Sequence, residues 1–151
     1  EADYIKDTLE KIGRVGFWKV AMKPGRPLAF GSIGKARFFG LPGNPVSVMV
    51  TFYQFVQPAL LKLAGARTEE YCLRITAQTT TALSKRPGRT EYQRGVLSHN
   101  DQGELLVSPT GDQGSGILRS MSVANCFIIL PAPGHSRRES MAPRPTWILA
   151  A

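Results

Sequence analysis

Two lysines, Lys19 and Lys23, stand four residues apart in the segment FWKVAMKPGRPLAFG. If residues 16–22 form a strand, both side chains lie on one face, and Lys23 stands at the carboxyl end beside Pro24 and Gly25. Ligands of open α/β sheets bind beyond the carboxyl ends of the strands. The pair is therefore a candidate for holding an oxyanion or phosphate with two point charges, although two surface lysines would give the same pattern.

A second candidate is the loop GLPGNPVS, which contains Gly40, Pro42, Gly43, Asn44 and Pro45 and precedes a long apolar segment. Asparagine is a favoured N-cap, and proline suits the first position of a helix. Glycines permit a tight turn and close approach of another group, while prolines fix φ. The loop predicts a rigid cradle whose N–H groups face an anion, with an ordinary helix start as the alternative.

The distribution of charge agrees with an anionic ligand. The chain has 19 Lys or Arg and 11 Asp or Glu, a net charge of +8. Residues 11–68 contain nine basic residues and no acidic one. A folded unit with this segment presents a positive field, for which a small-anion site, a solvated basic face and a nucleic-acid contact are the alternatives.

Cysteine and histidine show no metal-site pattern. Cys72 and Cys126 lie far apart, and His99 and His135 are isolated, unlike the ligand spacing of zinc sites. Both cysteines are predicted to be reduced, packed thiols of a cytoplasmic protein. No segment reaches the roughly 18 consecutive apolar residues of a membrane span, so we expect no membrane association.

The elements that must position these residues begin with α/β material. Residues 4–12 predict a helix capped by Asp3, residues 15–22 a strand, and residues 27–41 two strands around a turn at 32–35. Residues 46–64 predict an amphipathic helix packed on a sheet, which Pro58 kinks or divides and Gly65 ends. Its apolar stripe comprises Met49, Phe52, Tyr53, Val56, Leu60 and Leu63.

After residue 66 the sequence predicts strands. β-branched residues alternate over 71–83, two strands flank the turn HNDQG, and further strands are expected at 122–134 and 145–150. Short strands with frequent turns favour a small all-β domain of barrel type. The predicted domains are residues 1–65 and 66–151. The first, with unpaired strand edges, would be half a domain, and we expect its other half before Glu1.

Five segments occur in the order found in molybdopterin molybdenumtransferases: EADYIKD, FWKVAMKPGRPLAFG, GLPGNPVSVMVTFYQFVQPALLKLAG, EYQRGVL and GDQGSG. The sequence resembles this family, which the gephyrin E domain also resembles, over nearly its whole length. The resemblance implies the C-terminal half of a molybdopterin-binding α/β domain, with helices on a mostly parallel sheet, followed by a small β-barrel domain. It also implies a homodimer formed through N-terminal domains that precede this chain.

The same resemblance implies a reaction and its residues. Molybdenum from molybdate is inserted into adenylylated molybdopterin with release of AMP, with Mg²⁺ assisting and a molybdopterin adenylyltransferase as the upstream partner. Lys19 and Lys23 match the family's lysine pair, and Asp3 matches an acidic residue that would bind Mg²⁺ or orient water. Arg94 and Ser115 match an arginine and a serine that hold molybdate.

Two other classes of function remain as alternatives. A basic nucleic-acid-binding module would use the positive charge, but the large aromatic residues are interpreted as core and not as a base-stacking surface. A dimeric scaffold that binds a partner peptide could coexist with an enzyme. The remaining arginines of the second half are interpreted as solvated loop charges: Arg86, Arg89, Arg137, Arg138 and Arg144.

Overall fold

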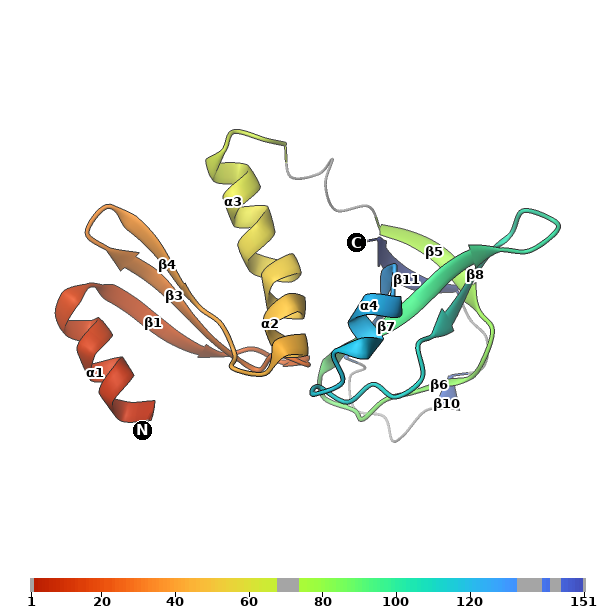
Figure 1. The fold of residues 1–151 in the computed structure, drawn as a ribbon, viewed down its shortest axis with the longest axis horizontal. Coiled ribbons are helices and arrows are strands. Elements are labelled where there is room, and N and C mark those ends of the chain that lie inside the picture. Colours follow the sequence, from red (N-terminus) through yellow and green to blue (C-terminus); the bar gives the residue numbers. More distant parts are fainter. Residues whose placement is uncertain (1, 68–73, 133–139, 142–144, 151) are drawn as a thin grey trace.

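The computed structural model describes residues 2–67, 74–132, 140–141 and 145–150 (Figure 1). Its first part is a helix and a three-stranded sheet in the order β1-β3-β4, namely α1 (Ala2–Ile12), β1 (Arg14–Lys19), β3 (Pro27–Ile33) and β4 (Ala36–Gly40). The predicted turn at 32–35 is confirmed. Both strand pairings are antiparallel, so these three strands do not show the mostly parallel arrangement expected for the sheet, because the tight turn reverses the chain between β3 and β4.

Helix α1 covers one face of this sheet. Leu9 of the helix is buried with Val15 and Ala29 of the strands, since alternate strand residues point to the same face. The helix begins at Ala2, before the predicted cap. Asp3 therefore lies in the first turn and not at the N-cap, and its side chain lies outside what the structure describes.

The long helix is a run of three segments, α2 (Pro45–Thr51), the π-helical η1 (Phe52–Val56) and α3 (Gln57–Leu63). Proline has no N–H and crowds the carbonyl four residues earlier. A π-helical turn directly before Pro58 meets this constraint, so the predicted division is confirmed. The predicted stripe is wrong in part: Val46 and Val50 are fully buried, whereas Leu60 and Leu63 are 49% and 63% exposed.

The expectation of no membrane association stays a prediction, and this helical run bears on it. The 19 residues Pro45–Leu63 are long and apolar enough to cross a membrane by length and composition alone. A helix that packs in a protein core meets the same criterion. The first turns of this run are buried against the second sheet through Val46 and Val50, and this packing explains their apolar character.

The second part is a small closed barrel. Strand β7 pairs with β8, β8 with β5, β5 with β11, β11 with β9, and β9 again with β7. The predicted barrel and the hairpin at HNDQG are thus confirmed. The elements of this part are β5 (Arg74–Thr79), β6 (Leu83–Ser84), β7 (Thr90–His99), β8 (Leu105–Pro109), α4 (Arg119–Val123), β9 (Cys126–Leu130), β10 (Ser140–Met141) and β11 (Pro145–Ala150). The strand predicted from residue 122 begins only at Cys126, because a short helix precedes it.

A short strand joins the two parts. The chain leaves the first sheet after Lys19, and strand β2 (Met22–Lys23) runs parallel to the start of β7, with Lys23 opposite Glu91. Met22, Val46, Val50 and Phe127 form one buried cluster across this junction. The single strand predicted over residues 15–22 is therefore wrong: β1 ends at Lys19, and the N–H of Val20 bonds the carbonyl of Arg26 at 2.8 Å to close a loop. The boundary near residues 65–68 stays a prediction.

Candidate anion-binding site

A recess of about 510 Å³ lies at this junction, and we call it the serine recess. Three segments that are distant in sequence line it: residues 22–26, Ser47 near the start of α2, and residues 112–115 of the loop after β8. Arg89 completes the wall. The structure thus brings Lys23 and Ser115 together as the sequence predicted, and adds Ser47 from the GLPGNPVS segment.

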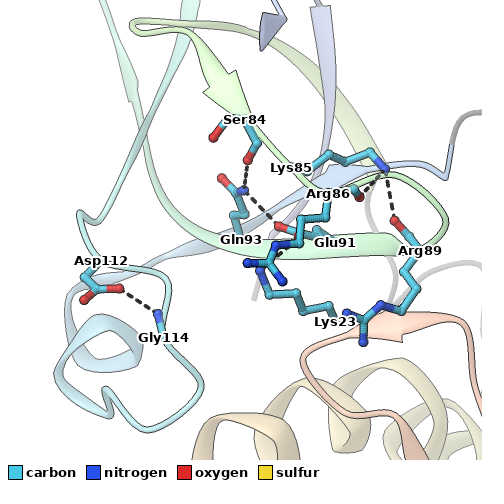
Figure 2. Close-up of polar contacts among 9 residues, drawn as sticks. All are labelled: Lys23, Ser84, Lys85, Arg86, Arg89, Glu91, Gln93, Asp112 and Gly114. Carbon is cyan, nitrogen blue, oxygen red and sulfur yellow. Dashed lines mark hydrogen bonds and ion pairs between the residues drawn. The ribbon is translucent and has the colours of Figure 1, made fainter. Parts of the chain in front are cut away.

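Lys23 is held in place from the barrel side. Its Nζ lies 3.0 Å from Glu91 Oε1, and the Glu91 side chain is only 5% exposed. Glu91 Oε2 accepts a hydrogen bond from Gln93 Nε2 at 3.2 Å, and the same amide donates to the carbonyl of Ser84 at 3.0 Å (Figure 2). The side chain of Lys23 is 44% exposed, so its ammonium keeps access to the recess while one direction is fixed by the carboxylate.

Arg94 does not line this recess. It is 1% exposed, with Nε donating to Ser120 Oγ at 2.9 Å and a terminal nitrogen donating to the carbonyl of Gly114 at 3.0 Å. Burial lowers the pKa of the Arg94 guanidinium, and the nearby carboxylate of Asp112 opposes that shift. The predicted role of Arg94 in holding molybdate stays a prediction, and in this structure its guanidinium holds the loop that contains Gly114.

That loop carries Ser115. Besides the bonds from Arg94, the Gln113 side chain accepts from the Arg94 N–H at 2.7 Å and donates to the Arg94 carbonyl at 3.1 Å. The N–H of Gly114 donates to Asp112 Oδ1 at 2.9 Å (Figure 2). Ser115 itself is exposed. Its hydroxyl therefore stands on a braced turn and is free to meet a ligand.

The other predicted residues lie outside the serine recess. Lys19 is exposed at the end of β1, opposite Pro27, and belongs to the first sheet, whereas Lys23 belongs to the second. Gly40 is the last residue of β4, and Pro42, Gly43 and Pro45 are also absent from its walls. The two lysines therefore belong to different sheets and not to the single strand that was predicted.

Asn44 occupies the N-cap position with extended backbone, and Pro45 takes the first helical position, as predicted. The Asn44 side chain makes no capping hydrogen bond. Its Oδ1 is buried without a hydrogen-bond partner. The loop therefore contributes to the recess through the start of the helix, at Ser47, and not through the Pro-Gly residues themselves.

The recess has an excess of positive charge. Lys23, Arg26 and Arg89 line it against a single carboxylate, Asp112, one of whose oxygens is already bonded to Gly114. Such a balance favours an anion. Arg26, Ser47 and Asp112 were not predicted as wall residues, and Arg89 was interpreted from the sequence as a solvated loop charge. Arg26 and Arg89 could have been predicted as wall residues from the sequence, because Arg26 follows the KPG segment and Arg89 precedes a predicted strand.

The residues of the recess do not include enough acidic side chains to form a magnesium site. Within the part of the chain that the structure describes, no group of three His, Cys, Asp or Glu side chains could hold a metal ion. The two acidic side chains near Lys23 are engaged by protein partners. We therefore derive no step through a metal from the described residues.

Comparison with known families agrees with this two-part architecture. Residues 1–62 match the family described as probable molybdopterin binding domain. Residues 76–139 match the MoeA C-terminal region, domain IV.

Similar proteins point the same way. A molybdopterin molybdenumtransferase of Haemophilus influenzae is 48% identical over 130 residues, covering 86% of this chain and 32% of that protein. A gephyrin of Dictyostelium discoideum is 37% identical over 164 aligned positions, covering 92% of this chain and 23% of that protein. The crystal structure of a molybdopterin biosynthesis moeA protein from Pyrococcus horikoshii superposes with a TM-score of 0.70 at 28% identity, covering 100% of this chain and 39% of that one. The chain thus spans about a third of the length of the Haemophilus protein.

Proposed function

Because the chain belongs to the molybdopterin molybdenumtransferase family, we propose that the complete protein inserts molybdenum from molybdate into adenylylated molybdopterin and releases AMP. The observation that carries this proposal is the serine recess, in which Lys23, Ser47 and Ser115 from three distant segments line one positively charged cavity. A reaction between an oxomolybdate and a phosphoanhydride needs such a place, since both reactants are anions.

The residues of the recess have distinct proposed roles. Lys23 neutralises an anionic oxygen of molybdate or of the phosphoanhydride, with its ammonium oriented by Glu91. The Ser115 hydroxyl donates a hydrogen bond to an oxygen of the same anion. Arg94 acts as a positioning residue, because it fixes the loop that presents Ser115. Fixed donors aimed at developing charge are the usual source of electrostatic catalysis.

Further components of the proposal lie outside the serine recess. Homodimerisation would bring N-terminal domains to the site, and a molybdopterin adenylyltransferase would supply the adenylylated substrate in the cytoplasm. Magnesium would take oxygen ligands such as Asp3. Lys19, exposed on a different sheet from Lys23, would serve a part of the substrate or of the protein beyond this recess.

The test is molybdate-dependent cofactor formation by the full-length protein. Lys23→Ala and Ser115→Ala should each reduce the rate by about tenfold or more, because each removes a charged or hydroxyl donor from the recess. Lys35→Ala is the matched control, since Lys35 is exposed in the turn between β3 and β4. Normal rates in both recess variants would refute the proposal, as would equal loss in the control.

A further inference from the structure

A second recess adjoins the first and is not used by the proposed reaction. It encloses about 700 Å³ between the start of β7, the segment around β6, and the end of β8, and we call it the glutamate recess. Lys23 and Gln113 line both recesses. The additional cations here are Lys85 and Arg86, of which Arg86 was interpreted from the sequence as a solvated loop charge.

The one carboxylate that lines this recess, Glu91, is already neutralised. One of its oxygens pairs with Lys23 at 3.0 Å and the other accepts from Gln93 at 3.2 Å. Three cationic side chains therefore line the cavity against a single, engaged carboxylate. The remaining positive charge favours an anionic ligand over a metal ion or a neutral one.

The loop that carries these cations is itself organised. Lys85 Nζ donates to the carbonyls of Arg86 and Arg89, at 3.4 and 3.0 Å, so the loop curls round its ammonium. Gly88, with φ of +90°, permits this reversal. No carboxylate in the described part of the chain forms an ion pair with Arg86. Figure 2 shows the Arg86 guanidinium directed toward the same space as the Lys23 ammonium.

Arg86 has no carboxylate partner among the described residues, and Glu91 alone does not neutralise both Arg86 and Lys23, so an oxyanion between these two cations would lower their mutual repulsion. We propose that the glutamate recess is a second oxyanion site that binds a tetrahedral anion of the phosphate or molybdate type. Arg86 supplies a planar fork that matches two oxygens, and Lys23 supplies a point charge. Because Lys23 also lines the serine recess, the two anions compete for it, and occupancy of one recess weakens binding at the other.

The experiment measures binding of inorganic phosphate and of molybdate to the full-length protein by equilibrium dialysis at fixed ionic strength. Arg86→Gln should weaken one class of sites by about tenfold, which is the loss expected for one charge-assisted hydrogen bond. Ser115→Ala should leave that class within about twofold and weaken the other. Arg119→Gln is the matched control, because Arg119 is an exposed arginine on α4 that lines neither recess.

The outcomes separate this site from the proposed reaction. Unchanged oxyanion binding in Arg86→Gln overturns the second site, as does a loss equal to that in Arg119→Gln, which would indicate only nonspecific attraction to positive charge. Loss of both classes in Ser115→Ala would also overturn it, since a single shared site would then remain. Cofactor formation that fails in Ser115→Ala but persists in Arg86→Gln leaves the proposed function intact and tests the second site on its own.

Discussion

Lys23 and Glu91 should contribute unequally to stability when each is removed alone. Their side chains meet at 3.0 Å, but Lys23 is 44% exposed and Glu91 only 5% exposed. Replacing the lysine leaves a buried carboxylate with one remaining partner, Gln93. Replacing the glutamate leaves an ammonium that water can reach. The cost of each change follows from the partner that stays behind.

The magnitudes can be worked from that asymmetry. Removing one partner from a buried ion pair costs about 3–5 kcal/mol, and a hydrogen bond to a charged group is worth about 1.5–3 kcal/mol. Lys23→Met should cost about 3 kcal/mol, since Glu91 keeps its bond to Gln93. Glu91→Gln should cost about 1–2 kcal/mol, because the lysine can rehydrate. The difference corresponds to about tenfold in the local opening equilibrium.

Hydrogen exchange by mass spectrometry measures this opening in the full-length protein. The peptides to follow cover β7 (Thr90–His99), whose first residues pair with β2. Lys62→Met is the control, since Lys62 is exposed in the last turn of α3. The double variant should cost less than the sum of the two single ones. Equal protection in the two single variants, or a larger loss in Glu91→Gln, would refute the reasoning.

Three further predictions follow from the barrel. Arg94→Lys should lower the free energy of unfolding by about 2–3 kcal/mol and slow cofactor formation, because lysine lacks the planar fork that bonds Ser120 and the carbonyl of Gly114. Wild-type values in scanning calorimetry and in the rate assay would contradict this prediction. Burial raises the pKa of the Cys126 thiol from 9.0 to about 11, so its stabilising contribution, about 2–3 kcal/mol, is present below pH 9 and lost as the pH rises through about 11. Urea unfolding between pH 8 and about 11 should therefore have a steeper pH dependence in the wild type than in Cys126→Ala, and parallel curves would count against it. Gly95→Ala should destabilise the barrel by about 1–3 kcal/mol, since a Cβ there would lie 2.8 Å from Ile128 Cγ1, and an unchanged melting temperature would exclude this crowding.

Local patterns in the sequence predicted most of the elements. Gly34 and Lys35 marked the turn between β3 and β4, and Pro58 marked the division of the long helix, because both effects act within a few residues. The closed barrel followed from the number and spacing of short strands. These local patterns did not predict which strands pair with one another. Strand β2 has two residues, and its pairing with β7 depends on a segment about 68 residues later in the chain.

The candidate site was likewise predicted only in part. Lys23 and Ser115 do line one recess, whereas Arg94, chosen for its fork, is buried behind the loop it holds. The alternating polar residues Glu91 and Gln93 are consistent with a hydrogen-bond network on β7. Only the tertiary contact with Lys23 shows that this network holds a residue of the candidate site. Side-chain identity indicates which chemistry is possible, and tertiary contacts decide which atoms remain free for it.

The pairing of β2, which lies between two strands of the first sheet in the sequence, with the barrel strand β7 also limits how the two units could be inherited. A barrel taken from residue 66 onward would lose the strand opposite Thr90 and Glu91, and Phe127 would lose the buried cluster that it forms with Met22, Val46 and Val50. If this barrel were fused to another α/β unit, that unit would have to supply a strand that pairs with β7 and apolar residues equivalent to Val46 and Val50. We therefore expect the two units to be inherited together. Lys23 lies at their junction, and its partner Glu91 belongs to the barrel.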